Sequence, residues 1–333
     1  YMDYPFISVI VPVYNEEHYL DACLSSMLRQ DYPKDQMEWF FVDGMSTDRT
    51  GDMLADYQRE YPALIKVLKN KSRTVPYAMN LAIRQAKGRY IIRLDAHAEY
   101  ADDYFSACVH VLEETGADNV GGVMETKART PMGGLIAKML SSRFGVGNSE
   151  FRTNGKDGYV DTVPFGAFRR EIFDKVGLYD ERLTRNQDSE LNYRIIHSGG
   201  RIYLSHRIRL AYYCRDSVKS IVNMALLNGR WNIITMKLCP GSMRLRHFVP
   251  CLFDLSILGL GFLGLLWQPF WWLLALELIC YLGLDLLAAF QAGSNARERF
   301  ILMGLFPAFH LSYGWGSLRG IAAVLGGIEK KEF

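Results

Sequence analysis

The first 215 residues alternate between short apolar runs and stretches whose apolar residues recur at helical spacing. Four runs are typical of buried strands: FISVIVPVY (6–14), EWFFVDG (38–44), ALIKVLKN (63–70) and RYIIRLDAH (89–97). The segments between them predict helices: EEHYLDACLSSMLRQ, DRTGDMLADYQREY, and TVPYAMNLAIRQAKG, which Gly88 closes. Strands that alternate with helices predict an α/β fold with a mostly parallel sheet covered on both faces.

The last third of the chain has a different pattern. FVPCLFDLSILGLGFLGLLW (248–267) contains Asp254 as its one charged residue, and FWWLLALELICYLGLDLLAAF (270–290) contains only Glu277 and Asp285. Each is long enough to cross a hydrocarbon core about 30 Å thick. The alternative is a pair of buried helices in a water-soluble domain, but tryptophans flank the turn between the two segments, as they do at membrane interfaces.

Basic residues predict the orientation of these segments. Arg297 and Arg299 follow the second segment, and a basic stretch precedes the first, so both ends of the hairpin belong on the cytoplasmic side. A third apolar segment, 300–328, is interrupted by a proline, an arginine and several glycines, and it either crosses or dips and returns. The predicted organisation is listed in chain order: an α/β domain at 1–215, an amphipathic membrane-interface segment at 216–247, and a transmembrane region of about three apolar segments at 248–333.

Charge is uneven along the chain although its net value is only +2 at pH 7. Residues 201–247 carry nine Lys or Arg and a single acid, Asp216, which is the profile of a surface that faces anionic lipid or phosphate. The six cysteines show no paired spacing and predict reduced thiols in a chain that faces the cytosol. The opening run YMDYPFISVIVPVY has no basic start, so we expect no signal peptide there.

Polar clusters follow three of the predicted strands: PVYNE (12–16), DGMSTD (43–48) and DAH (95–97). In parallel sheets, ligands collect at the carboxyl ends of the strands, so three such clusters predict one site. On an extended strand, Asp95 and His97 would point the same way and could share one metal ion. The alternative is a turn with a solvated aspartate and a partly buried histidine.

The motifs that carry these clusters resemble those of the family 2 glycosyltransferases with a GT-A fold. They are VPVYNE (11–16), FVDGMSTD (41–48), AMNLAIRQAKG (78–88) and IIRLDAHA (91–98), and the likeness continues through VPFGAFRREIFDKVGLYDE, NQDSELNYRI and NGRWN. Within the family the chain is most similar to membrane-anchored enzymes of bacterial exopolysaccharide assembly, the succinoglycan type of glucosyltransferase. The resemblance implies a GT-A nucleotide-sugar-binding domain followed by membrane helices.

The resemblance also assigns donor-binding roles. It implies that the loop with Pro12, Tyr14 and Glu16 lines the nucleotide and that Asp43 contacts the uracil end of a UDP-sugar. Arg73 stands where relatives place a basic residue near the donor, and its alternative is an ordinary solvated arginine. Asp48 either assists Asp43 or is a charge that favours a helix N-terminus.

Asp95 and His97 stand in the place of the family's D-x-D metal motif. A divalent cation there would neutralise the diphosphate leaving group. Imidazole suits first-row transition ions better than Mg²⁺, so His97 in place of a carboxylate favours Mn²⁺ over Mg²⁺.

Asp188 in NQDSELNYR matches the aspartate of the family's Glu-Asp pair, with Gln187 at the usual Glu. The resemblance implies that Asp188 is the base that takes the acceptor hydroxyl proton, and the alternative is an acidic first turn of a helix. Arg230 and Trp231 resemble the end of the Q-x-x-R-W motif, with Leu227 at the Gln position. They would contact a diphosphate and a sugar, or lie on an amphipathic interface helix, or both.

Three functions are compatible with this sequence. The leading one is an inverting transferase that moves a sugar from a UDP-sugar to a polyprenyl-diphosphate-linked saccharide, at a bacterial inner membrane and with its catalytic domain in the cytoplasm. Its partners would be that donor, that acceptor and membrane lipids, with no nucleic acid. The alternatives are a processive polysaccharide synthase, which the incomplete Q-x-x-R-W motif disfavours, and an inactive membrane scaffold, which the set Asp43, Asp95 and Asp188 disfavours.

Overall fold

The computed structural model describes residues 4–147 and 156–327. Packing divides the described chain into two compact units, the first built from residues 4–125 and 156–212 and the second from 126–147 and 213–327. The second unit therefore takes an internal piece of the chain as well as its C-terminal part. The domain limits predicted at 215 and 247 stay predictions, and the last six residues of the predicted transmembrane region lie outside the described residues.

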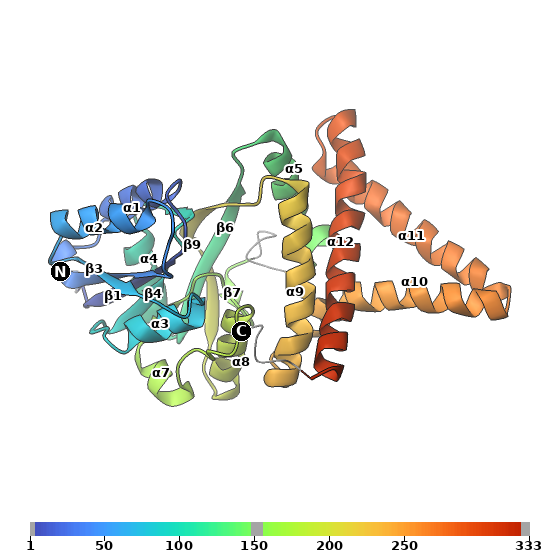
Figure 1. Ribbon diagram of the computed structural model, residues 1–333. Coiled ribbons are helices and arrows are strands. Elements are labelled where there is room, and N and C mark those ends of the chain that lie inside the picture. Colours follow the sequence, from blue (N-terminus) through green and yellow to red (C-terminus); the bar gives the residue numbers. More distant parts are fainter. Residues whose placement is uncertain (1–3, 148–155, 328–333) are drawn as a thin grey trace. The chain divides into compact units, whose positions relative to one another are not determined.

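One mixed sheet forms the centre of the first unit (Figure 1). Its strands in the described chain are β1 (Ile7–Val13), β2 (Met37–Asp43), β3 (Ile65–Lys69), β4 (Tyr90–Arg93), β5 (Ala98–Tyr100), β6 (Asn119–Lys127), β7 (Gly158–Tyr159), β8 (Ala167–Arg169) and β9 (Ile202–Tyr213). Their order is β3-β2-β1-β4-β8-β6-β9-β5, with β7 paired to β9. The first four strands are parallel, as the sequence predicts, and β8 then pairs antiparallel with both β4 and β6.

Helices pack on both faces of this sheet. They are α1 (Leu20–Leu28), α2 (Thr50–Glu60), α3 (Val75–Ile83), α4 (Tyr104–Thr115), α7 (Glu171–Val176) and α8 (Gln187–His197), with a 3-10 turn η1 (Lys34–Gln36). Figure 1 shows α1 and α2 on one side of the parallel strands and α3 on the other. Strands β1 and β2 are buried along almost their whole length, which explains their continuous apolar runs.

Two predicted element ends were wrong. The helix predicted to end at Gly88 stops at Ile83, and Gly88 instead lies in the tight approach to β4, where a Cβ would come within 2.3 Å of the Ser8 nitrogen. The strand predicted to run to residue 97 ends at Arg93. The chain turns after it, and β5 then pairs with β9 in another part of the sheet.

The second unit is helical. Its described elements are α5 (Pro131–Leu140), α6 (Arg143–Val146), α9 (Val218–Leu238), η2 (Leu245–Phe248), α10 (Val249–Leu266), α11 (Pro269–Ala292) and α12 (Ala296–Leu325). Glycines bring α9 and α12 into close contact: a Cβ on Gly229 would lie 1.9 Å from the Tyr313 carbonyl oxygen, and one on Gly316 would lie 2.1 Å from the Leu226 carbonyl oxygen. An apolar cluster with Ile136 and Phe306 joins α5 and α12.

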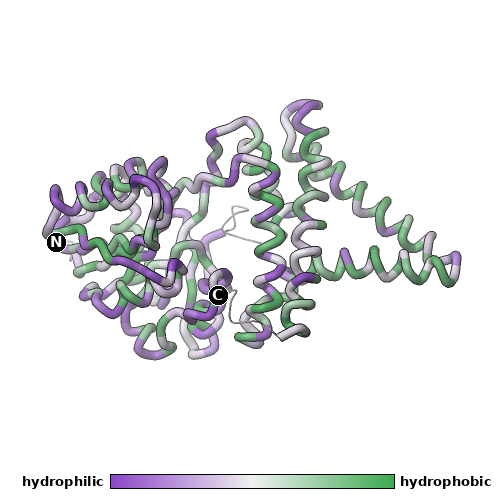
Figure 2. Tube along the Cα trace, viewed as in Figure 1, coloured by the Kyte–Doolittle hydropathy of each residue, from purple (hydrophilic) through white to green (hydrophobic). Residues whose placement is uncertain are grey.

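Two stretches of this unit are long and apolar enough to cross a membrane, Leu245–Leu266 and Pro269–Ala292. Only 17% of each most apolar window is buried, and Figure 2 shows hydrophobic residues along both α10 and α11. Asp254 and Asp285 within them are buried, as charged side chains of membrane helices usually are. Within the described residues, α12 does not pass the same test, although it is a single helix of 30 residues.

Candidate active site

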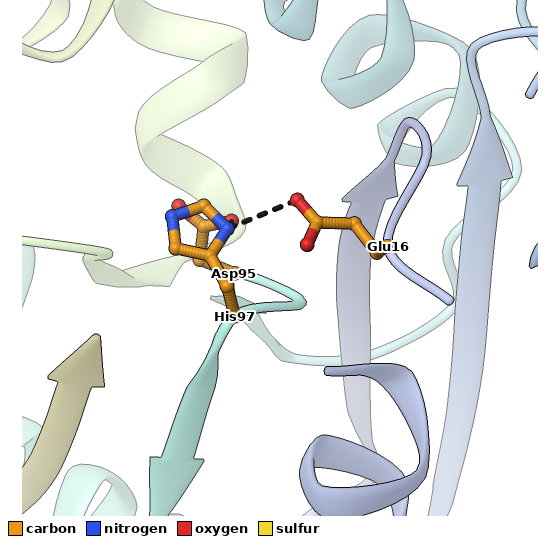
Figure 3. Close-up of side chains that lie close together, drawn as sticks. All are labelled: Glu16, Asp95 and His97. Carbon is orange, nitrogen blue, oxygen red and sulfur yellow. Dashed lines mark hydrogen bonds and ion pairs between the residues drawn. The ribbon is translucent and has the colours of Figure 1, made fainter. Parts of the chain in front are cut away.

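Glu16, Asp95 and His97 form a group that could hold a metal ion (Figure 3). Glu16 follows β1, and the other two lie in the turn between β4 and β5. One ligand atom from each side chain lies within 4.8 Å of the others. The His97 Nδ1 atom is 3.0 Å from Glu16 Oε1 and 3.2 Å from Asp95 Oδ1. Asp95 and His97 thus come together through a turn, and the prediction of an extended strand there was wrong.

The environment of His97 suits a metal ligand. Its Nε2 atom lies 2.9 Å from the Tyr212 hydroxyl, so the second ring nitrogen has a fixed partner. Burial lowers the pKa of His97, but the charge of Asp95 and the hydrogen bond with Glu16 outweigh burial and raise this pKa to about 11. Two carboxylates and an imidazole that gives up its proton are a donor set that fits a divalent transition ion such as Mn²⁺.

Hydrogen bonds hold the loop after β1 against the loop after β2. The Asn15 N–H donates to Ser46 Oγ at 3.0 Å, and the Glu16 N–H donates to Thr50 Oγ1 at 2.8 Å. Asp48 accepts from the Thr50 N–H at 3.0 Å and from the backbone N–H of the residue after Glu16. Burial raises the pKa of Asp48, but these hydrogen bonds outweigh burial and hold this pKa below its ordinary value. Of its two predicted roles, Asp48 fills the structural one in these contacts.

Asp43 lies at the end of β2 and is buried. It accepts from the Ser46 N–H at 2.9 Å and from Lys69 Nζ at 2.8 Å. Burial raises its pKa, but the hydrogen bonds from Lys69 and Ser46 bring it below the ordinary value. The guanidinium of Arg73 lies over the ring of Tyr14, 6.0 Å from its centroid, and Tyr14 is 45% exposed. An open aromatic face with a cation thus lies on the loops that carry the site.

Asp188, in the first turn of α8, has a partner that was not predicted. The Arg93 Nη1 atom donates to Asp188 Oδ1, although the two residues are 95 positions apart. The Arg93 side chain is 7% exposed and that of Asp188 is 34% exposed. Burial lowers the pKa of Arg93, but the charges of Asp188 and Asp95 raise it above its ordinary value. Arg93 is therefore a permanent cation that bonds Asp188 of α8 and is also stabilised by the charge of Asp95.

Backbone strain is concentrated in the loops that carry these motifs. Five non-glycine residues of the described chain have positive φ, and they are Asn15 (54°), Met45 (64°), Arg73 (62°), Phe165 (46°) and Asn186 (62°). Each belongs to a motif that the resemblance singled out or to the loop of Arg73. Strained backbone of this kind accumulates at functional sites, which supports a single site built from all five loops.

The sequence analysis also assigned donor contacts to Pro12, Arg230 and Trp231. Pro12 lies within β1, opposite Val42. Arg230 and Trp231 lie on α9 in the second unit, and Trp231 is only 8% exposed. Their predicted contacts with a diphosphate and a sugar stay predictions.

The basic stretch that begins at residue 201 is partly neutralised where it forms β9. Arg207 pairs with Glu114, Arg209 lies 3.3 Å from Asp103, and His206 contacts Asp157. The run of basic residues along the sequence is therefore not a run of uncompensated charge along this strand.

The sequence did not point to Arg93 or Tyr212, and it gave Glu16 a nucleotide-binding role rather than a metal-binding one. The sequence does contain an indication for Arg93, because an arginine inside the apolar run YIIRL needs a buried partner. It contains no such indication for Tyr212. It lies 115 positions from His97, and only the pairing of β5 with β9 brings the two together.

Comparison with known proteins identifies the family. The family model for glycosyl transferase family 2 matches residues 8–177, about half of the chain. The match contains the motifs from VPVYNE to IIRLDAHA and most of VPFGAFRREIFDKVGLYDE, whereas NQDSELNYRI and NGRWN lie beyond it. The chain belongs to glycosyltransferase family 2. As a member of this family it is a glycosyltransferase, and the predicted family was correct.

Two curated relatives extend this family assignment. The dolichyl N-acetyl-α-D-glucosaminyl phosphate 3-β-D-2,3-diacetamido-2,3-dideoxy-β-D-glucuronosyltransferase of Methanococcus voltae is 32% identical over 67% of this chain and 72% of its own length. The succinoglycan biosynthesis protein ExoA of Rhizobium meliloti is 30% identical over 73% of each chain. The predicted similarity to succinoglycan-type enzymes is thereby confirmed.

A solved structure supports the fold of this glycosyltransferase. The mannosyltransferase PcManGT from Pyrobaculum calidifontis, in complex with GDP-Man and Mn²⁺, superposes with a TM-score of 0.59 over 99% of this chain and 89% of its own. The two are 19% identical, so the likeness concerns the fold alone. It confirms the predicted GT-A type of fold.

Proposed function

We propose that this glycosyltransferase moves one sugar, with inversion, from a UDP-sugar to a polyprenyl-diphosphate-linked saccharide in exopolysaccharide or cell-surface glycan synthesis. The observation that carries the proposal is that the end of β4 and the turn after it contribute both to the metal group and to the contact with Asp188. Asp95 and His97 belong to the metal group, and Arg93, two residues earlier, holds Asp188. This arrangement supports a donor site next to a base.

Glu16, Asp95 and His97 would hold the divalent cation, with Mn²⁺ favoured by the imidazole ligand. When bound, this ion neutralises the charge that develops on the diphosphate as it departs. Asp43 at the end of β2 would contact the uracil, and the loop Pro12–Glu16 would line the nucleotide. The exposed ring of Tyr14, with Arg73 over it, offers a stacking face for the base.

Asp188 would act as the base. An acceptor hydroxyl attacks the anomeric carbon, the new carbon–oxygen bond forms as the bond to the leaving phosphate breaks, and the hydroxyl proton passes to the Asp188 carboxylate. Attack from the face opposite the leaving group inverts the anomeric configuration. The 34% exposure of the Asp188 side chain leaves it open to an acceptor.

The second unit and the relatives support the proposed acceptor and location. The apolar hairpin of α10 and α11 suits a bilayer, where a polyprenyl chain is dissolved. The Methanococcus relative is named for a dolichyl-phosphate-linked acceptor, and ExoA for succinoglycan assembly. We infer a bacterial cytoplasmic membrane, with the first unit in the cytoplasm and Arg230 of α9 near the lipid diphosphate.

The test is a donor and acceptor screen with the purified full chain. UDP- and GDP-sugars are compared for thermal stabilisation and turnover with Mn²⁺, and a synthetic polyprenyl-diphosphate saccharide is the acceptor. We expect one UDP-sugar to give a product one sugar longer, with inverted anomeric configuration by NMR. Turnover of GDP-sugars alone would contradict the donor, a retained configuration would contradict the mechanism, and a ladder of products would identify a processive synthase.

A further inference from the structure

Arg93 is an unusual residue for its position. It is the last residue of β4, a strand whose other residues are apolar or aromatic and buried. A buried guanidinium is costly unless it is paired, and the carboxylate that accepts its hydrogen bond here is Asp188, through Oδ1. The buried Tyr179 also interacts with the guanidinium. The pair links β4 to the first turn of α8, so the position of the Asp188 carboxylate depends on the position of Arg93.

The loop of residues 165 and 166 contacts Arg93 in turn. Its backbone N–H donates to the Gly166 carbonyl oxygen at 3.0 Å, and its guanidinium lies 5.8 Å from the centroid of the Phe165 ring. Phe165 has a φ of 46°, which only a strongly determined loop imposes on a phenylalanine. Its ring also stacks on Tyr212, with centroids 5.9 Å apart and planes at 29°. The guanidinium thus lies between a carboxylate and an aromatic ring, while its Nε has no hydrogen-bond partner in the described part of the chain.

We propose that Arg93 is a positioning residue for transfer: it anchors Asp188 through Oδ1 and turns Oδ2 towards the acceptor hydroxyl. This inference rests on the proposed role of Asp188 as base. In the transfer step, the proton of the hydroxyl passes to Oδ2, while Oδ1 keeps its bond from Arg93. Asp95 follows Arg93 by two residues, so the end of β4 positions both the metal group and, through Arg93, the proposed base. A small shift of Arg93 would move the base away from the metal group.

A double-mutant cycle tests this inference. Arg93→Met, Asp188→Asn and the double variant are compared for kcat, for UDP affinity with Mn²⁺ and for Tm. We expect Arg93→Met to lower kcat by about tenfold to a hundredfold, as misplacement of a reacting group does, with UDP affinity unchanged. In the Asp188→Asn background, the same substitution should lower kcat by less than about twofold, because Arg93 acts only through Asp188.

Misfolding is a possible cause of a lower rate, so two further variants are included. Arg93→Lys keeps the charge and should recover part of the lost kcat. The double variant of the cycle removes both charges and so leaves no unpaired buried charge. Arg169→Met, on the neighbouring strand, is the matched control. Arg169 bonds the Ala117 and Leu112 carbonyl oxygens, so its loss should lower Tm and spare kcat.

The outcomes separate this inference from the proposed function. If Arg93→Met lowers kcat by the same factor in both backgrounds, or if it leaves kcat unchanged while Asp188→Asn is slow, the positioning role is overturned and the base stands. If Asp188→Asn itself transfers at the parent rate, the proposed base is wrong and the inference falls with it.

Discussion

The Nε2 atom of His97 lies 2.9 Å from the hydroxyl oxygen of Tyr212, and this contact joins the turn after β4 to the end of β9. It leaves the opposite ring nitrogen, Nδ1, facing the carboxylates of Glu16 and Asp95. An outer partner of this kind orients a ligating imidazole and selects the nitrogen that meets the metal. Tyr212 is therefore part of the proposed metal site although it is not one of its ligands.

We predict that Tyr212→Phe weakens Mn²⁺ binding by about 10-fold to 100-fold, the usual effect of losing an outer hydrogen bond at a metal site. Calorimetric titration of Mn²⁺ in the presence of UDP measures this loss. Phenylalanine keeps the ring that stacks on Phe165, so the change reports on the hydroxyl alone. Tyr203→Phe, on the same strand, is the control, and an equal loss there would contradict the prediction.

The imidazole ligand should also set the metal preference. We predict higher activity with Mn²⁺ than with Mg²⁺, and a smaller difference in His97→Asp, because a carboxylate suits Mg²⁺ better than imidazole does. Initial rates of transfer with each ion give the ratio, and His110→Asp on α4 should leave it unchanged. Full activity of the parent in EDTA would show that no such ion is needed.

Asp188 and Glu190 should respond differently, although they are two residues apart. Asp188→Asn should slow transfer by at least about a hundredfold, since general-base help is worth 10²–10⁴-fold, and should spare UDP affinity. Glu190 is buried, and both of its oxygens accept from Arg194 at 2.7 Å. Glu190→Gln should therefore cost about 1–3 kcal/mol of stability with little change in kcat.

Rates and unfolding curves of the two variants decide this point. A slow but stable Glu190→Gln, together with a normal rate for Asp188→Asn, would move the base to Glu190.

The lowered pKa of Asp43 predicts a dependence of stability on pH. A carboxyl group whose pKa is lower in the folded state stabilises the fold above its unfolded pKa, near 3.8, and loses this contribution as pH falls through the folded pKa. Part of the fall in Tm below about pH 4 should therefore disappear in Asp43→Asn. Asp52→Asn, on the exposed side of α2, is the control. If the Tm of Asp43→Asn falls with acid pH as steeply as that of the parent, Asp43 does not contribute to this pH dependence.

Packing in the second unit predicts opposite results for two helical glycines. A Cβ on Gly229 would lie 1.9 Å from the Tyr313 carbonyl oxygen, whereas one on Gly259 would meet nothing within 4 Å. Gly229→Ala should destabilise the α9–α12 pair by about 1–3 kcal/mol. Gly259→Ala should be neutral or stabilising by up to about 1 kcal/mol. Thermal unfolding in detergent micelles measures both, and equal melting temperatures would contradict this packing.

Local patterns predicted the parallel half of the fold and most of the loops that form the candidate site. The apolar runs of β1, β2 and β3 and the polar residues after β1, β2 and β4 lie within short windows of sequence, where periodicity and strand ends carry the information. Arg93 contacts Asp188 across 95 positions of sequence, and Tyr212 contacts His97 across 115 positions. Long-range pairing leaves no local period, so these contacts came only from the structure.

The pairing of β5 with β9 also has a consequence for synthesis of the chain. Ala98 faces Tyr212 across that ladder, so the turn that holds Asp95 and His97 gains its last neighbour only after residue 212 has left the ribosome. The first apolar span begins at Leu245, shortly after that point. A nascent chain therefore gives this turn its partner strand at about the time its first apolar span is made, and a fragment that ends before β9 lacks both that strand and that span.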